Sequence, residues 1–250
     1  MALSALPFPR YFAYETFLWT HRALAVLMMC SLWRYDGLSG GMKLFLLVGL
    51  SAYVLTSCCR LARLIYHNYS FRGGWSRCSV FARTRDLSAV EVRINLARPV
   101  HVRSGQYVFL WLPGVSLSAF VQFHPFSIAW WHNDVDGKTR ELSLLVKPQH
   151  GLTAHLATHA NSQRKLLAAV DGPYGKPINT SAYGTILLFA SDMGIAGVMA
   201  VAKESMSMRH QWKSSTRRVY LIWQVNNRGS LCSLLGVIKK SRSAYATAAP

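Results

Sequence analysis

Two glycine-containing segments of this chain have the residue types that bind phosphate groups. The first runs from Lys147 to Thr153 (KPQHGLT) and lies between an expected strand and a helix expected at Thr153–Ala160. Gly151 lets the backbone approach a phosphate closely, and the N–H groups at the helix start attract anions. A simple helix start with Thr153 as its capping residue would give the same pattern, so both interpretations stay open.

The second segment follows a short, wholly apolar run at Ile186–Ala190, which is typical of the buried first strand of a parallel sheet. Gly194 and Gly197 (GIAG) open a helix expected to reach about Met208. Arg218–Gln224 is the next expected strand. A strand, a glycine turn, a helix and a second strand begin a dinucleotide-binding βαβ unit.

Asp192 places a carboxylate two residues before Gly194, where a pyrophosphate would approach backbone N–H groups. Like charges are unfavourable there. The Cβ atom would also be strained if the backbone at this position has a positive φ. The side chain could instead point outward, so the sequence predicts weakened nucleotide binding without fixing its cause.

Ahead of these nucleotide elements in the chain, the stretch from Phe71 to about Asp171 is rich in expected strands. Residues 89–95 (AVEVRIN) alternate apolar and polar, as a half-buried strand does. Further short strands are expected at Val100–Val102, Tyr107–Leu112 and Leu142–Lys147, with a hairpin turn at Asp136-Gly137. Strands at this spacing indicate a small antiparallel barrel.

Three motifs occur in order along this β-rich part. They are Gly105-Gln106-Tyr107, then His124-Pro125-Phe126-Ser127 followed by Ala129-Trp130-Trp131, and finally Asp171-Gly172-Pro173-Tyr174-Gly175. Pro125 is expected to stiffen a turn. An ordinary strand with an incidental His-Pro pair would also contain the second motif, so the order of all three carries more weight than any one.

The first 70 residues have the composition of a membrane part. Leu44–Cys59 carries no charge and becomes a plausible bilayer span when its neighbours are added, although a buried core helix is an alternative. Arginines follow from Arg60 onward and place this end in the cytosol by the positive-inside rule. The earlier run Tyr11–Trp33 contains His21, and ionisable groups within a membrane segment usually face protein, water or a cofactor. His21 is therefore a candidate ligand of haem iron.

The overall composition limits the functional class. The chain has 250 residues, 51% of them hydrophobic, and a formal net charge of +18. No nucleic-acid-binding motif occurs and the basic residues are spread along the chain, so we expect no nucleic-acid partner; the charge fits contact with membrane lipid better. Five cysteines without a CxxC pair indicate neither a disulfide framework nor a zinc site. Cys58 and Cys59, beside the expected membrane exit, could be palmitoylated or simply small apolar helix residues.

From Tyr11 to Val225 the chain resembles the fungal ferric reductases, relatives of the NADPH oxidases with an FR-type FAD-binding domain. The resemblance is carried by the run YETFLWTHRALAVLMMCSLWRY, the HPFS motif and the turn ASDMGIAG. It implies a multi-part fold: two N-terminal transmembrane helices that end a haem domain (1–70), a ferredoxin-reductase-like antiparallel β-barrel that binds FAD (71–178), and a partial α/β NADPH-binding domain (179–250). By the same resemblance, the sequence is truncated at both ends.

The resemblance also implies roles for individual residues. Ser127 would lie near flavin N5, Phe126 would cover the ring or ribityl chain, and His124 would lie near the phosphates. The other cofactor-binding residues it implies are Pro125, Lys147, Gly151, Leu152, Thr153, Gly172, Pro173, Tyr174 and Gly175 for FAD, and Gly194 and Gly197 for NADPH. His21 matches the first haem b ligand, but Tyr35 stands fourteen residues later, where the family commonly has its second.

The implied activity is that of a ferric-chelate reductase, which passes electrons from NADPH through FAD and haem to ferric iron outside the cell. FAD is needed as the carrier between NADPH and haem, because NADPH gives electron pairs whereas haem accepts one electron at a time. We expect the plasma membrane as its location, with the flavin and nucleotide parts in the cytosol. One alternative is a superoxide-producing NADPH oxidase. Another is an inactive truncated remnant or incomplete gene model, which Asp192, Tyr35 and the missing segments favour.

Overall fold

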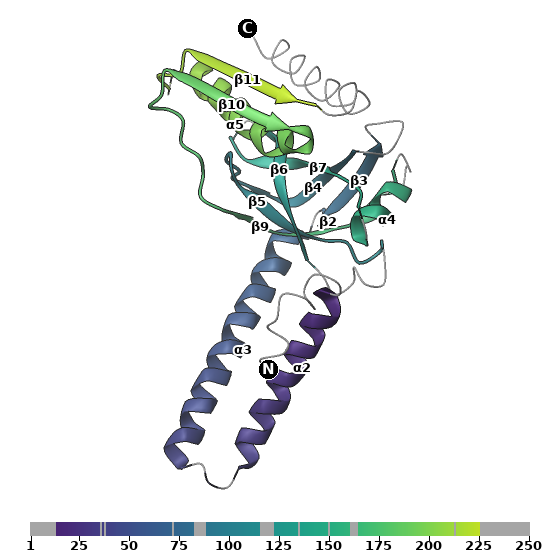
Figure 1. Cartoon of the computed structure of the whole chain (residues 1–250), viewed down its shortest axis with the longest axis vertical. Coiled ribbons are helices and arrows are strands. Elements are labelled where there is room, and N and C mark those ends of the chain that lie inside the picture. Colours follow the sequence, from purple (N-terminus) through teal and green to yellow (C-terminus); the bar gives the residue numbers. More distant parts are fainter. Residues whose placement is uncertain are drawn as a thin grey trace. The chain divides into compact units, whose positions relative to one another are not determined.

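The computed structural model of the chain describes residues 14–35, 37, 39–71, 73–82, 89–115, 123–134, 136–149, 151–160, 165–212 and 214–225 (Figure 1). The chain divides into two compact units, Met1–Leu61 and Ala62–Pro250.

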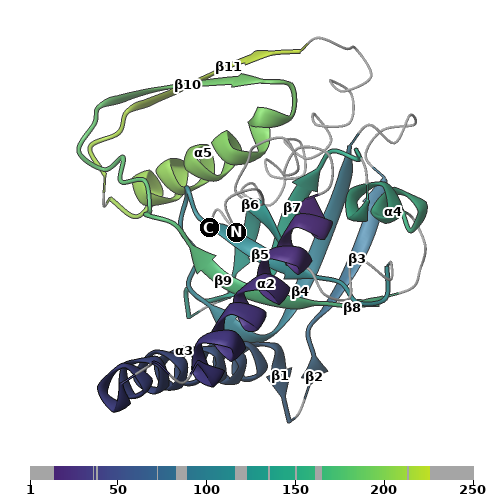
Figure 2. The same cartoon turned by 60° about the horizontal axis from the view of Figure 1, so that its bottom comes forward.

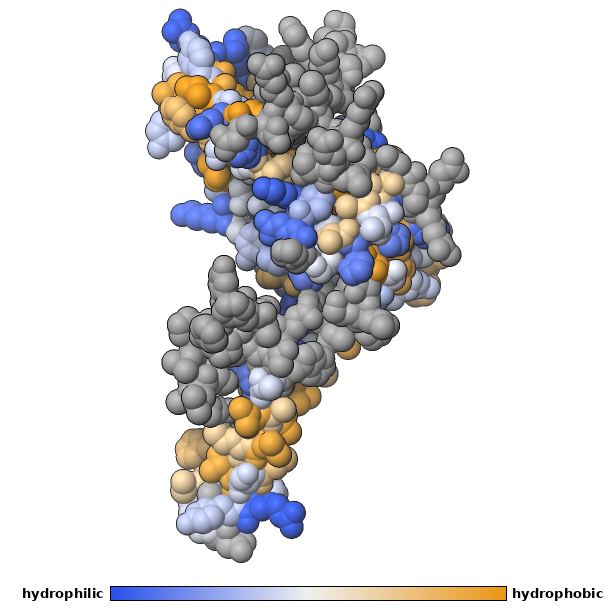
Figure 3. Space-filling view, turned by 45° about the vertical axis from the view of Figure 1, so that its right-hand side comes forward, coloured by the Kyte–Doolittle hydropathy of each residue, from blue (hydrophilic) through white to orange (hydrophobic). Residues whose placement is uncertain are grey.

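The first unit is helical. It contains α2, Tyr14–Arg34, and most of α3, Gly40–Asn68. Within the described ranges, α3 is the one helix long and apolar enough to cross a membrane, judged by length and composition. Apolar side chains cover much of this unit's surface (Figure 3). The helix predicted around His21 is confirmed as α2, whereas its crossing of a membrane stays a prediction.

Hydroxyl groups on α3 hydrogen-bond to the helix's own backbone. Ser51 Oγ donates to the Val48 carbonyl and Thr56 Oγ1 to the Tyr53 carbonyl, both at 2.9 Å. Such internal bonds satisfy polar groups that would be costly to leave unpaired in hydrocarbon. The few hydroxyls of α3 are therefore compatible with a bilayer.

The second unit is built on one curled antiparallel sheet, as the sequence predicted. Its order is β8-β3-β4-β7-β6-β5-β9. The strands are β3 Arg77–Ala82, β4 Val90–Val100, β5 Tyr107–Trp111, β6 His124–Asn133, β7 Thr139–Val146, β8 Leu166–Leu167 and β9 Ala169–Tyr174, with a separate hairpin of β1 Tyr69–Ser70 and β2 Gly74–Trp75.

The two edges of this sheet are formed by neighbouring parts of one segment. β8 pairs with β3 at one edge, and β9 pairs with β5 at the other. Only Ala168 separates the two strands, and its N–H donates to the Ser76 carbonyl at 3.1 Å. The segment Leu166–Tyr174 thereby closes the sheet into a barrel, which leaves fewer unpaired strand edges.

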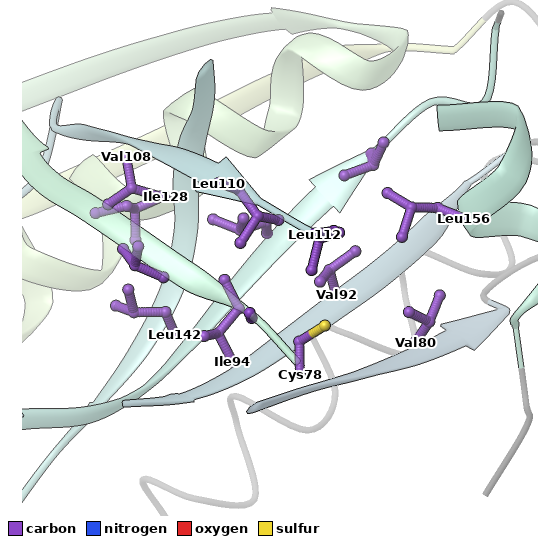
Figure 4. Packing of buried hydrophobic residues seen from close by; sticks show 14 of the residues in the cluster. Cys78, Val80, Val92, Ile94, Val108, Leu110, Leu112, Ile128, Leu142 and Leu156 are labelled. Atoms are coloured by element: carbon purple, nitrogen blue, oxygen red, sulfur yellow. The ribbon is translucent and has the colours of Figure 1, made fainter. Parts of the chain in front are cut away.

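Period-two alternation fills the barrel with branched apolar side chains (Figure 4). Val108, Leu110 and Leu112 are fully buried, while the β5 residues between them are half-buried on the other face. The helix α4, Leu152–Thr158, contributes Leu156 to the same core. Each such side chain contributes about 1.5–3 kcal/mol through burial. Burial also raises the pKa of the Cys78 thiol to about 12, so this cysteine is a packing residue rather than a reactive thiolate.

The end of α3 is bonded to the closing segment. Asn68, 1% exposed, donates through Nδ2 to the carbonyls of Val170 (2.7 Å) and Leu64 (2.9 Å). Its Oδ1 accepts the Val170 N–H at 2.7 Å. The side-chain amide therefore pairs with the β9 backbone as a neighbouring strand would.

The predicted βαβ unit is confirmed. It consists of β10 Thr185–Ser191, the short 3₁₀ turn η3 Asp192–Gly194, α5 Ile195–His210 and β11 Arg218–Gln224, and its two strands are parallel. α5 lies between this pair and the barrel (Figure 2). On the face that α5 leaves open, Leu187 opposes Tyr220 and Phe189 opposes Ile222, and all four are exposed.

Two consecutive charged residues of α5 fix it to the barrel. The Lys203 Nζ lies 4.7 Å and 4.2 Å from the ring centroids of Trp130 and Trp131 and donates to the Trp131 carbonyl. Glu204 accepts hydrogen bonds from Arg103 Nε at 3.0 Å and from the Ser104 N–H. Burial lowers the pKa of Lys203 to about 7, and the indole faces oppose part of that effect because they favour the charged amine.

We predict that Asn68→Ala lowers the free energy of unfolding by about 1–3 kcal/mol, since it leaves the Val170 backbone groups without their buried partner. Urea titration of the detergent-solubilised chain measures this. Gln149→Ala, at an exposed amide, is the matched control and should change little. Equal, small effects of both substitutions would contradict the role assigned to Asn68.

Lys203 makes stability depend on pH in a defined direction. Between about pH 7 and the ordinary lysine value of 10.5, the unfolded chain binds more protons at this amine than the folded chain does. The free energy of unfolding should therefore rise with pH across that window, by at most about 1.4 kcal/mol per pH unit. Below pH 7 both states hold the proton, so the contribution levels off.

Lys203→Met keeps the aliphatic stem and removes the amine, so it should flatten this rise. Unfolding midpoints measured at several pH values report it, with Lys176→Met at an exposed lysine as the control. A slope that is as steep in Lys203→Met as in the Lys176→Met control would show that another group is responsible.

Candidate functional site

The outer face of β5, β6 and β9 carries a group of aromatic side chains beside an exposed hydroxyl. Tyr107 lies opposite Ser127, and Phe109 lies opposite Pro125, so these pairs share the face that points away from the core. The rings of Tyr107, Phe109 and Tyr174 contact one another at centroid distances of 5.6 to 6.0 Å. We call Tyr107, Phe109, Pro125, Ser127 and Tyr174 the outer aromatic face.

The HPFS residues are divided between the two faces of β6. His124 lies opposite the buried Leu110, and Phe126 lies opposite the buried Val108 and packs against the core. Ser127 and Pro125 are exposed on the other face. The register therefore brings Ser127 to Tyr107 and separates it from Phe126, and the roles assigned to the individual side chains stay predictions.

Pro125 was expected in a turn and instead lies within β6. It pairs with Phe109 of β5, while the pairing of β6 with β7 begins only at Ile128. Proline is tolerated in a strand where its missing N–H would face no neighbouring strand. That geometry explains how a proline fits within a strand of the barrel.

The predicted phosphate segment forms a tight turn into α4. Gly151 has φ 61° and ψ −130°, and nothing lies within 4 Å of the position a Cβ would occupy. Lys147 is exposed, whereas the Leu152 side chain is buried, so only the backbone of Leu152 is available to a ligand. This turn combines a glycine conformation, open space, a cation and a helix start, all of which suit a phosphate. His150 lies outside the described residues.

Thr153 does not cap α4, contrary to the expectation from its position. The helix begins at Leu152 and ends at Thr158, and Gly151 is its N-cap without a side-chain bond. The Thr153 hydroxyl accepts the Gln149 N–H at 3.0 Å. Because the strand ends sooner and the turn is tighter than predicted, Thr153 stabilises the turn itself.

The glycines of the DGPYG motif allow β9 to lie close to β5. Gly172 and Gly175 have φ 139° and 97°, and a Cβ on either would approach the Tyr107 backbone or ring to 3.3 Å. The Tyr174 hydroxyl donates to the Asp171 carboxylate at 2.7 Å, and Arg63 pairs with the same carboxylate at 3.2 Å. This motif therefore shapes the outer aromatic face, while Gly172, Pro173 and Tyr174 also line a cavity on the α3 side of the barrel.

The nucleotide turn has the positive φ that the sequence analysis considered. Asp192 has φ 41°, and its carbonyl accepts the Trp223 Nε1–H at 3.0 Å. Gly194 and Gly197 are exposed at the start of α5 with open space around them. Two glycines there permit a phosphate to approach, whereas Asp192 adds a carboxylate and a Cβ at a position that suits glycine.

The haem interpretation is not tested by the described residues. His21 is exposed on α2. Across the described part of the chain, no cluster of three or more His, Cys, Asp or Glu side chains could hold a metal ion.

Several residues that shape the site were not singled out from the sequence. Arg63 and Asn68 bond the end of α3 to β9, and Lys203 and Glu204 dock α5. Their partners lie roughly seventy to a hundred residues away, so no local pattern indicates them. The arginines after the membrane run were the one available signal, and they were interpreted only as charge.

Comparisons with known proteins agree with this geometry. Residues 78–178, which include the outer aromatic face and the Gly151 turn, match the family model of an FAD-binding domain. Ferric reductase transmembrane component 3 of Saccharomyces cerevisiae is 25% identical over 208 residues, covering 81% of this chain and 27% of that protein. The probable cell surface ferric reductase kap2 of Aspergillus oryzae is 24% identical over 236 residues, covering 89% of this chain and 30% of that protein.

The chain spans less than a third of the length of these relatives. Among solved structures, the ferredoxin reductase in carbazole 1,9a-dioxygenase matches 65% of this chain and 45% of its own, with 16% identity and a TM-score of 0.49. A likeness at this level says nothing about function. Residues 78–178 therefore match an FAD-binding domain, and over most of its length the chain is similar to fungal ferric reductases at 24–25% identity.

Proposed function

We propose that this chain is the flavin-binding portion of a membrane ferric-chelate reductase, which receives electrons from NADPH. The observation that carries the proposal is the coincidence of the FAD-binding match with a surface of suitable chemistry. On that surface an exposed hydroxyl, Ser127, lies beside aromatic rings. A positive-φ glycine turn with an exposed lysine follows β7.

The residues present fit FAD. Tyr107 and Tyr174 offer an aromatic surface for the isoalloxazine ring, and Ser127 offers a hydrogen-bonding group near it. Lys147 and the backbone at Gly151 would hold the diphosphate. Bound FAD would supply the conversion of a hydride's electron pair into single-electron transfers. Docking of α5 through Lys203 and Glu204 would keep the βαβ unit close to this face.

The proposed acceptor and location rest on the relatives. Their names describe ferric reductases with transmembrane or cell-surface placement, and the chain covers less than a third of each. The helix α3 has the length and composition to anchor the chain in a membrane. We therefore propose ferric chelates as acceptors and a plasma-membrane location with the barrel in the cytosol. Haem at His21 stays a prediction.

An inactive form is the second candidate, because Asp192 occupies a left-handed position in the nucleotide turn. Both its charge and its Cβ oppose the close approach of a pyrophosphate. FAD binding and NADPH binding are therefore separable parts of the proposal, and each has its own test.

For FAD, we predict that Gly151→Ala weakens binding about tenfold, because an added Cβ disfavours the φ of 61° that opens the turn toward the phosphates. Quenching of FAD fluorescence on titration with the detergent-solubilised chain measures the affinity. Gly137→Ala is the matched control, since Gly137 has φ 71° in open space at a hairpin turn. FAD binding that is equally affected, or equally unaffected, in both variants would remove the Gly151 turn from the site.

For NADPH, two substitutions separate charge from backbone strain. Asp192→Asn removes the charge and should tighten binding roughly tenfold to a thousandfold if the carboxylate lies near 4 Å from a phosphate. Asp192→Gly removes the Cβ as well, so any further gain reports strain at φ 41°. Reduction of bound FAD by NADPH under anaerobic stopped flow gives the concentration dependence. Tight NADPH binding by the unmodified chain would overturn the inhibitory role of Asp192.

A further inference from the structure

A basic cavity lies where the end of α3 joins the barrel. It has a volume of about 330 Å³ and is lined by Arg63, His67, Pro99, Val100, His101, Gly172, Pro173 and Tyr174. Two of its three basic side chains come from α3 and the third from the segment after β4. The cavity is thus assembled from parts of the chain that only folding brings together.

The polar groups of this cavity suit an anion. Asp171 is 3% exposed, and its carboxylate accepts from Arg63 and from the Tyr174 hydroxyl. Arg63 donates to Asp171 and Tyr174 through Nη2. The N–H groups on Nε and Nη1 of the same guanidinium can donate to a ligand. His67 and His101 add two imidazoles that can donate to a phosphate oxygen.

The spacing along α3 relates the cavity to the proposed membrane. Arg63 and His67 follow Cys59, the last residue of the uncharged run, by four and eight residues. These separations correspond to about 6 and 12 Å of helix. The headgroup region on each side of a bilayer is roughly 5–8 Å thick. If α3 spans the hydrocarbon core with Leu44–Cys59, Arg63 lies at the level of the lipid phosphates and His67 lies just outside the headgroup region.

We propose that this cavity binds the phosphate of an anionic phospholipid headgroup, at a site that adjoins the FAD surface at Tyr174. The inference rests on the proposed membrane placement of α3. Arg63 serves as the charged ligand and His101 as the ligand from the barrel. Because Arg63 also contacts Asp171 and Tyr174, the bound headgroup stabilises the junction between α3 and β9. The site makes the position of the barrel depend on the composition of the adjacent leaflet.

Chemical labelling of histidine tests the site directly. The full chain is placed in nanodiscs of phosphatidylcholine alone or of phosphatidylcholine mixed with phosphatidylserine. Modification by diethylpyrocarbonate is then followed residue by residue with mass spectrometry. Labelling of His67 and His101 should slow about fivefold in the mixed discs, the effect of roughly one favourable ion contact. His155, exposed on α4, is the internal control and should label equally in both.

A third arm adds inorganic phosphate to the phosphatidylcholine discs. Protection there equal to that in the mixed discs would replace the headgroup by a soluble phosphate and overturn the proposal. Arg63→Gln should abolish the protection, whereas Arg217→Gln, at a distant exposed arginine, should preserve it. Far-UV circular dichroism of Arg63→Gln checks that the barrel remains folded. Equal labelling of His101 in both kinds of nanodisc would also overturn the proposed headgroup site. Failure of the chain to insert into the nanodiscs would overturn both the site and the proposed membrane placement of α3.

Discussion

The segment Leu166–Tyr174 is the constraint on which the second unit depends. Its first two residues pair with β3, and four residues of β9 pair with β5, so one stretch of chain holds both edges of the barrel. Asn68 inserts its amide against Val170 in the same segment, and Arg63 pairs with Asp171. Closure of the barrel and attachment of the α3 end therefore depend on the same segment. A distortion of β9 would weaken both sets of contacts.

The same segment shapes the candidate flavin surface. Because Gly172 and Gly175 lack side chains, Tyr174 can lie against Tyr107 and Phe109 on the outer face of β5. The barrel interior is closed by branched side chains, so a ligand as large as FAD must lie outside it. On the other side, α5 is held by charged contacts to β6 and to the segment after β4, of which the Lys203 contact is partly buried and the Glu204–Arg103 contact is exposed. These contacts join the βαβ unit to the barrel that matches an FAD-binding domain.

Local patterns predicted much of this architecture. The alternation at 89–95 indicated β4, and the apolar run, glycine turn and following strand indicated the βαβ unit, with β11 observed at the residues expected. The positive φ observed at Asp192 is one of the two conditions that the sequence left open at this turn. These features depend on neighbours in the chain, which is why spacing reveals them.

Features set by distant pairing were not predictable in the same way. His124 and Phe126 lie on the opposite face of β6 from Ser127. Which face points to the core follows from the register of β6 against β5, which no local motif encodes. Thr153 was assigned as a helix cap because composition does not reveal that its hydroxyl bonds the Gln149 backbone instead. The contacts of Asn68 and Arg63 join residues more than a hundred positions apart.

Hydrogen–deuterium exchange of the full chain, with and without FAD, tests the central claim most directly, namely that the flavin binds on the outer face of β5 and β6 and at the Gly151 turn. Exchange should slow on FAD addition in peptides covering 105–111, 123–128 and 147–156, and it should stay unchanged in β10 and the η3 turn. Slowing confined to 185–200, or no change in any barrel peptide at saturating FAD, would contradict the account.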